Sequence, residues 1–386
     1  MERLNSNDSY DMGKVPSHGA VRLDDDDAAG PSGRRSEDPD AVVADDAVQY
    51  RVYKRRFIGL AQLMALNLVV SWDWLTFAAV STTSAAYFDV SEASINWLST
   101  AYVYRPLSPP LVFLFAFVPM TPLVIYTLNK GGPKTSILAS SALVLVGNWI
   151  RYAGTRAHGG NFPIVMLGQI LVGFAQPFVL AAPTRYSALW FSDAGRVSAT
   201  ALASLANPLG AALGQLVGPL WATGSKADGG IPNLVLYTSL LSTLVTLPAP
   251  FIPASPPTPP SRLAASETLA LRPALRALPR NLDFWLLALP FAIYVGFFNA
   301  VSSLLNQILS PYGFTETDAG IAGGLLILVG LVASAVVSPL VDRTRQHLLV
   351  IKLLVPLIAT AYLLLIFMPA TRAVGGPYAV CALLGA

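Results

Sequence analysis

Long apolar runs, separated by short polar stretches, make up most of the chain after residue 53. An α-helix needs about 20 apolar residues to cross the hydrocarbon core of a bilayer, because its backbone groups must pair within the segment. The runs that we expect to be helical are 57–81, 95–128, 135–152, 163–182, 198–222, 233–252, 284–309, 319–340 and 348–368, with a tenth beginning near Tyr378. The pattern predicts an all-α polytopic membrane protein.

The run 95–128 differs from the others because it is too long for one crossing at about 1.5 Å per residue. Prolines also interrupt it, among them Pro106, Pro109 and Pro110. A helix interior tolerates proline poorly. We therefore interpret 105–119 as surplus residues of the kind that an incorrect gene model introduces.

Polar segments divide the chain into regions. Residues 1–52 are acidic and rich in Pro, Gly and Ser, and such a composition buries too little apolar area to fold. These residues also lack the apolar core of a signal peptide. We expect a disordered cytoplasmic tail at 1–52, a six-helix bundle at 53–252, a cytoplasmic linker at 253–281 and an incomplete bundle of about four helices at 282–386.

Basic residues collect in alternate loops, and Lys and Arg favour the cytoplasmic side of a membrane. The basic loops contain Arg51, Lys54, Arg55, Arg56, Lys130, Lys134, Arg185, Arg196, Arg262, Arg272, Arg276, Arg280, Arg343 and Arg345. The intervening loops contain fewer basic residues, and two of them contain the acids Asp89 and Glu92, and Glu316 and Asp318. We expect a multi-pass protein of the plasma membrane with a cytoplasmic N-terminus.

Composition excludes several classes of protein. Only 12% of the residues are charged, against about 25% in soluble domains, and a net charge of +3 is too small to indicate nucleic-acid binding. The three histidines, at 18, 158 and 347, all lie outside the apolar runs, which argues against a buried haem ligand. The sequence shows no nucleotide loop, metal-ligand cluster or nucleophile–base pair. We therefore expect no enzyme activity, no cofactor and no metal.

A polar and aromatic stripe follows the first apolar run. Asn67, Ser71, Trp74 and Ala78 share one helix face at this spacing. Such a face should point to protein or to a water-filled cavity. The π face of Trp74 could bind an ammonium group, a contact worth roughly 0.5–2 kcal/mol. A packing or interface tryptophan is the alternative.

Asp73 is the one acid inside the first apolar run. A carboxylate at mid-membrane costs a few kcal/mol, so it is usually paired or functional. Asp73 could attract a cation, carry a coupled proton, or pair with Arg151 or Arg185. Its direction, about 100° from Trp74 on a helix, means that the two side chains need not share a ligand.

Uncharged polar residues form two further stripes. Gln169 and Gln176 lie seven residues apart on one face, and a second stripe contains Asn299, Ser302, Ser303 and Asn306. Both stripes suit a small polar solute, and interhelical hydrogen bonds are the alternative. Gly210, Gly214 and Gly218 recur every four residues. An antiporter motif has this spacing, and close helix packing is the commoner explanation.

Six helices, a polar linker and further helices resemble the plan of the major facilitator superfamily, whose fold has two six-helix halves around a central cavity. That resemblance implies conformational loops at Gly131 and at Asp342 and Arg343, where a charge cluster would latch neighbouring helix ends. Positive-inside anchoring is the alternative. It also implies two helices beyond the tenth, so we expect a truncated second half.

Three segments resemble the feline leukaemia virus subgroup C receptor family more closely: Ser71–Phe77, Ala175–Leu180 and Val301–Gln307. This resemblance implies transport of choline and ethanolamine, with haem export as an earlier assignment. The family's cation site matches Trp74 and Gln176. The aromatic that it adds on the seventh helix is matched equally by Phe291, Tyr294 and Phe298. Asp73 departs from the family, which has a neutral polar residue there.

We therefore expect a monomeric transporter that moves a small solute across a lipid bilayer by alternating access, with choline or ethanolamine as the best candidates. The candidate substrate-binding residues are Trp74, Gln176, Asn67, Ser71, Gln169, Asn299, Ser303 and Asn306. The candidates for coupling or ion pairing are Asp73, Arg151 and Arg185. The alternatives are a proton-coupled carrier of a monocarboxylate, drug or haem-like solute, and a truncated inactive product.

Overall fold

The computed structural model describes residues 51–100, 117–222, 230–260, 278–344 and 346–386. Within these ranges every regular element is a helix. The predicted tail falls almost wholly outside them, as does most of the predicted linker. Residues 105–119, which we interpret as surplus, lie mainly outside the described residues. Pro106, Pro109 and Pro110 are among those that do.

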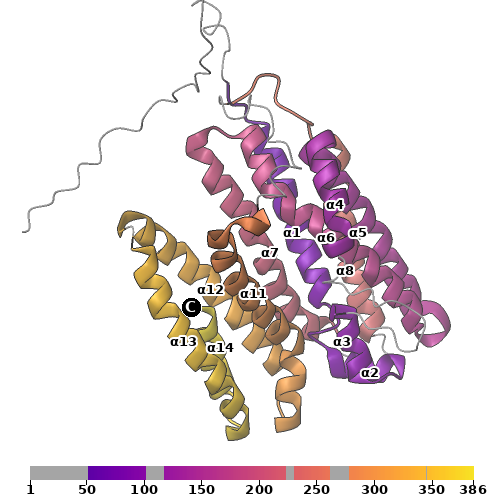
Figure 1. Ribbon diagram of the computed structural model, residues 1–386. Coiled ribbons are helices and arrows are strands. Elements are labelled where there is room, and N and C mark those ends of the chain that lie inside the picture. Colours follow the sequence, from indigo (N-terminus) through magenta and orange to yellow (C-terminus); the bar gives the residue numbers. More distant parts are fainter. Residues whose placement is uncertain (1–50, 101–116, 223–229, 261–277, 345) are drawn as a thin grey trace, which may run out of the picture. The chain divides into compact units, whose positions relative to one another are not determined.

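The helices fall into two groups along the chain (Figure 1). The first helix group consists of α1 (Arg56–Leu75), α2 (Ser81–Phe88), α3 (Glu92–Thr100), α4 (Phe117–Tyr126), α5 (Gly132–Arg156), α6 (Phe162–Trp190), α7 (Asp193–Trp221) and α8 (Gly230–Thr246). The second helix group consists of α11 (Leu282–Leu309), α12 (Glu316–Thr344), α13 (His347–Phe367) and α14 (Gly375–Gly385). Short 3₁₀ turns, η3 (Ala157–Gly159), η5 (Ala249–Phe251), η6 (Leu278–Arg280), η7 (Ser310–Tyr312) and η8 (Met368–Thr371), flank them.

Eight helical segments of the described chain are long and apolar enough to cross a membrane. They coincide with the predicted runs apart from 95–128, whose two ends form α3 and α4. The predicted tenth run corresponds to α14, which has 11 residues. The prediction of an all-α polytopic fold is therefore confirmed.

Three predicted boundaries are wrong. The first helix ends at Leu75, so Ala78 lies in the turn that follows and leaves the predicted stripe. The predicted loop 128–134 is helical instead, because a π-helical turn, η2 (Thr127–Gly131), leads directly into α5. The fourth helix continues eight residues beyond Ala182 to Trp190, since Pro183 lacks one backbone donor without ending α6.

Side-chain caps explain two helix starts. The Asn161 side chain accepts a hydrogen bond from the Ile164 amide at 3.3 Å, which satisfies one of the free donors of the first turn of α6. Asn281 caps α11 in the same way and accepts from the amides of Asp283 and Phe284. Both predicted runs therefore begin within a few residues of their observed starts.

Close packing of α7 on α1 depends on glycine. A Cβ atom added to Gly210 would overlap the backbone carbonyl of Leu68, which no side-chain movement can relieve. Gly214 and Gly218 lie one and two turns further along the same face and approach Trp72 and Ala79. The interpretation of these glycines as helix-packing residues is confirmed.

The two helix groups meet along α7 and α12. Glycine again allows the approach: a Cβ atom on Gly320 would crowd the carbonyl of Gln215, and one on Gly324 would crowd the Leu216 side chain. The second half of α11 is also buried here, at Val301, Ser302, Ser303, Leu305, Asn306 and Leu309. Most of the first half of α11, by contrast, is exposed.

Candidate functional site

Trp74 lies where helices of both groups converge. It is 4% exposed and belongs to a buried cluster with Val172 of α6, Ala211 of α7 and Val301 of α11. Residues of α1, α6, α7 and α11 thus belong to one buried cluster with Trp74. Trp72, two residues earlier, faces elsewhere and stacks on Trp221 at a ring distance of 5.4 Å.

The other two members of the α1 stripe differ in their hydrogen bonding. The Asn67 side chain donates to the carbonyls of Leu63 at 3.0 Å and Val179 at 3.5 Å, and Asn207 donates to its backbone carbonyl. Asn67 thus joins α1 to α6 and α7. Ser71 is fully buried, and its hydroxyl has no hydrogen-bond partner among the described residues.

The two glutamines of α6 also differ. Gln169 donates to the backbone carbonyl of Asp73 at 3.3 Å, so its amide serves helix packing. Gln176 lies between Gln169 and Val179 along α6, and these two contact Asp73 and Asn67 of α1. Its side chain is therefore level with the stretch of α1 that contains Ser71. Gln176 is 5% exposed, and its carbonyl oxygen has no partner in the described chain.

Asp73 is the centre of a buried charged network. Its carboxylate forms an ion pair with Arg151 of α5 at 3.2 Å, and both side chains are almost completely buried. Asn148 donates to the carboxylate at 2.6 Å and Ser242 of α8 at 3.3 Å. Of the two predicted partners, Arg151 is the one that pairs, whereas Arg185 is half-buried and makes no ion pair with Asp73.

The same network is supported from outside its ion pair. The Arg151 guanidinium lies 5.1 Å from the centre of the Phe77 ring, within cation–π range. The Ser239 hydroxyl donates to the backbone carbonyl of Asn148 at 3.1 Å. These contacts tie α1, α5 and α8 together and leave the Asp73 charge compensated.

The polar stripe of α11 lies against the first helix group. Asn306 and Ser303 are buried and Asn299 is half-buried. Asn306 donates to the Ser81 hydroxyl at 2.9 Å, and Gln215 of α7 donates to the backbone carbonyl of Ser302 at 2.5 Å. The stripe thus supplies hydrogen bonds between the groups, which was the alternative to solute binding.

The predicted conformational loops receive less support. Gly131 is the last residue of the π-helical turn, where its carbonyl accepts from the Thr135 hydroxyl at 2.6 Å. Arg343 is exposed near the end of α12, and the side chain of Asp342 lies outside the described residues. A charge latch at these loops stays a prediction.

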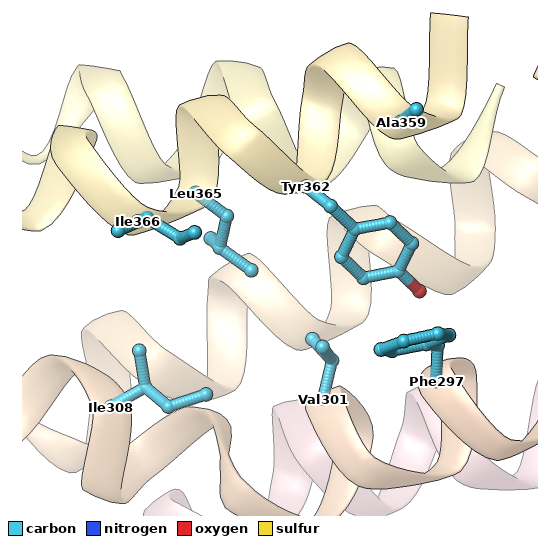
Figure 2. Close-up of a pocket in the computed structure, with 7 residues that line it drawn as sticks. All are labelled: Phe297, Val301, Ile308, Ala359, Tyr362, Leu365 and Ile366. Carbon is cyan, nitrogen blue, oxygen red and sulfur yellow. The ribbon is translucent and has the colours of Figure 1, made fainter. Parts of the chain in front are cut away.

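A cavity of about 590 Å³ lies between α11 and α13, and Trp74 is not among its lining residues (Figure 2). Phe297, Val301 and Ile308 of α11 face the α13 residues across it, and the Tyr362 hydroxyl is the polar group that the view shows. An apolar lining of this kind does not suit a charged or polar solute. The candidate site is therefore the region around Trp74, Ser71 and Gln176.

Sequence reasoning missed several residues that join the helix groups. The sequence indicates Glu316 only as a charged loop residue, and it indicates no contact for Thr83, Asn96 or Gln215. Their partners are more than 80 residues away along the chain, so no local pattern reveals them. The one available signal is polar side chains at the ends of apolar runs.

The described part of the chain contains no cluster of three or more His, Cys, Asp or Glu residues that could hold a metal ion.

The family model described as Major Facilitator Superfamily matches residues 63–386. The chain belongs to the Major Facilitator Superfamily. This membership confirms the predicted fold and makes the chain a multi-pass membrane protein.

Two curated relatives within the superfamily refine the comparison. Solute carrier family 49 member A3 of Danio rerio is 36% identical over 330 residues, which cover 83% of this chain and 66% of that protein. The choline/ethanolamine transporter FLVCR1 of Felis catus is 30% identical over 330 residues, which cover 82% of this chain and 56% of that protein. The predicted resemblance is confirmed, and the chain spans between half and two thirds of each relative.

Solved superfamily structures agree on the fold. A bacterial homologue of the lysosomal transporter Spinster, in an inward-facing conformation, matches with a TM-score of 0.60 and 17% identity over 86% of this chain and 75% of that one. The partially occluded, inward-open xylose transporter XylE of E. coli matches with a TM-score of 0.61 and 14% identity, over 86% and 85% of the two chains. At these identities the likeness concerns the fold alone.

Proposed function

We propose that this protein transports a small organic cation, such as choline or ethanolamine, by alternating access. The observation that carries the proposal is the position of Trp74, buried where α1, α6, α7 and α11 converge. Membership of the superfamily supports transport, and the similarity to a choline/ethanolamine transporter supports the substrate class.

The chemistry around Trp74 favours a cation recognised by an aromatic face. The nearby carboxylate of Asp73 is already paired with Arg151 and is therefore unsuited to bind a second cation. An ammonium group can instead lie over the indole ring. The free oxygens of Ser71 and Gln176 can accept hydrogen bonds from the hydroxyl or amine of the solute.

We place the N-terminus in the cytoplasm, because the basic loops alternate as the positive-inside rule requires. In this orientation, α2, α3 and the start of α12 lie on the outer side of the membrane. The adjacent ends of α1 and α11 lie on the same side. We further propose that the protein works as a monomer in the plasma membrane.

Proton coupling through Asp73 is the main competing mechanism. Asp73 accepts hydrogen bonds from Asn148 and Ser242 besides its ion pair with Arg151. Release or uptake of a proton there would break several buried contacts at once. We therefore assign Asp73 a structural role, and uptake that does not change with a proton gradient would agree with it.

The test is uptake of radiolabelled choline and ethanolamine into proteoliposomes, with substitutions at Trp74. Loss of a cation–π contact of roughly 0.5–2 kcal/mol predicts about a 2- to 30-fold weaker apparent affinity for Trp74→Ala. Trp74→Phe should lie between Trp74→Ala and the wild type, because phenylalanine retains a weaker aromatic face.

Matched controls separate binding from folding. Trp72→Ala removes the neighbouring tryptophan, which stacks on Trp221, and should leave the affinity unchanged in the folded fraction. Gln176→Ala should weaken uptake more than Gln169→Ala, because the Gln169 amide contacts only the backbone of Asp73 among the described groups. Equal uptake by Trp74→Ala and the wild type would remove Trp74 from the site.

A further inference from the structure

A single carboxylate joins the two helix groups at the end where α2 meets α12. The Glu316 side chain, in the first turn of α12, accepts from the Thr83 backbone amide at 2.8 Å and from the Thr83 hydroxyl at 2.6 Å. Thr83 belongs to α2 of the first helix group. The two oxygens of one carboxylate thus bind two donors of one residue across the boundary.

Asn306 of α11 adds a third donor. Its amide lies 3.4 Å from the Glu316 carboxylate and 2.9 Å from the Ser81 hydroxyl. Ser81 and Asn306 are both buried. The carboxylate is therefore the acceptor on which α2, α11 and α12 converge.

A second, uncharged contact lies at the same end. Asn96 of α3 and Gln307 of α11 exchange two amide hydrogen bonds, at 2.7 and 2.6 Å. Gln307 also donates to the backbone carbonyl of Glu92 at 3.3 Å. We name these cross-group contacts of Ser81, Thr83, Asn96, Asn306, Gln307 and Glu316 the α2–α12 joint.

We propose that Glu316 is the closing residue of the outer gate: its carboxylate holds the α2–α12 joint shut, and loss of its charge releases the outer ends of the two helix groups. The proposal rests on the proposed transport function, which requires the outer end to open and close. It adds a positioning residue that the substrate site does not supply.

The chemistry of the contact explains why charge matters. An ionised carboxylate only accepts hydrogen bonds, and all three of its partners here are donors. Hydrogen bonds to a charged acceptor are about twice as strong as neutral ones. Removing the charge therefore weakens the contacts that hold the joint.

Other charged groups do not replace this contact. Glu316 forms no ion pair within the described residues. The titratable groups on the neighbouring elements are Tyr87 and Asp89 of the α2 segment, Glu92 of α3, Asp318 of α12 and Tyr378 of α14. Asp318 accepts from Thr315 and Tyr378, all within the second helix group, and Tyr87 donates to the Thr155 carbonyl.

Asp318 therefore provides a matched control. It lies two residues from Glu316 in the same helical turn and also accepts several hydrogen bonds, but its partners Thr315 and Tyr378 belong to the second helix group. Asp318→Asn removes a charge from the same region without touching the joint. Glu316→Gln removes the charge from the joint itself with little change of shape.

The experiment measures access from outside to a cysteine behind the gate. Ser302 is buried on α11 beside Gln215 of α7, and Ser302→Cys in a Cys381→Ala background gives one reporter thiol. A membrane-impermeant methanethiosulfonate reagent is applied to either face of reconstituted full-length protein. No solute is present, so failure of the choline proposal leaves this measurement valid.

We expect Glu316→Gln to raise the rate of modification from the outer face about tenfold, the effect of losing one charged hydrogen bond. Asp318→Asn and the charge-retaining Glu316→Asp should stay within about twofold of the parent.

Two results would overturn the proposal. One is equal modification rates in Glu316→Gln and Asp318→Asn. The other is a faster reaction from the opposite face. Size-exclusion profiles of all variants confirm that they are folded, and Glu316→Asp separates a lost charge from a disturbed helix start.

Discussion

Two polar networks hold this molecule together, and they are built differently. The network around Asp73 lies within the first helix group, includes a full ion pair with Arg151 and is closed to solvent. The α2–α12 joint lies between the groups and consists of short hydrogen bonds among hydroxyls, amides and one carboxylate, several of them only partly buried. The first network is charged and buried, and the second is mostly neutral and partly accessible to solvent.

The difference has a physical reason. Separating a buried ion pair leaves two uncompensated charges in a medium of low dielectric, at a cost of several kcal/mol. Separating neutral amides that water can reach costs about 1 kcal/mol for each hydrogen bond, because water replaces the lost partner. A permanent contact can use the first type, whereas a contact that opens and closes under the proposed alternating access needs the second.

The largest effect is expected at Asp73. Asp73→Asn leaves the Arg151 charge buried without its counter-charge, so we expect a loss of about 3–5 kcal/mol. This loss should appear as a low folded yield and a lower melting temperature in detergent. The double substitution Asp73→Asn with Arg151→Gln should recover most of the stability, and equal melting of the single and double variants would contradict the permanent role of the pair.

An intermediate effect is expected from the glycines of α7 and α12. Gly210→Ala forces a methyl group against the Leu68 carbonyl inside the first helix group, and overpacking of this kind costs about 1–3 kcal/mol. Gly324→Ala meets only the Leu216 side chain, which can move. We expect a lower melting temperature for Gly210→Ala than for Gly324→Ala, and the reverse order would mean that contacts between the groups are the more rigid ones.

The smallest effect on stability is expected at Gln307. Gln307→Ala removes the amide exchange with Asn96 and should cost about 1 kcal/mol, with a melting temperature close to that of the parent. The rate of outside modification of the Ser302→Cys reporter should nevertheless rise. Asn96→Ala should have the same effect, and the double variant should add little, because both changes remove one contact. A large loss of stability without a change of access would place Gln307 among the permanent contacts.

The sequence predicts the helices well, because each apolar run is long enough to specify a crossing on its own. The starts of α5 and α11, for example, lie within a few residues of the predicted ones. The π-helical turn before Gly132 could not be predicted in this way, since apolar length does not distinguish a loop from a continued helix. The run predicted at 163–182 likewise ends before Pro183, whereas α6 continues through this proline to Trp190.

The site was predicted only in part. Asp73 had two possible partners in the sequence, and helix packing selects Arg151 because α5 lies beside α1 and Arg151 points to it. Periodicity placed Asn67 and Gln169 on polar faces, but it could not tell that the Asn67 and Gln169 amides bind backbone carbonyls. The roles of Glu316 and Gln307 depend on contacts across more than 200 residues, which one sequence does not reveal.

The Asp73 network also constrains how the protein is made. Asp73 enters the translocon with α1, and Asn148, its hydrogen-bond partner, follows 75 residues later on α5. A lone carboxylate or guanidinium at mid-helix adds about 2.5–3.5 kcal/mol to the insertion of its segment. Each of the two helices therefore enters lipid less favourably alone than beside the other, and the pairing of Asp73 with Arg151 recovers part of this cost once α5 has followed α1.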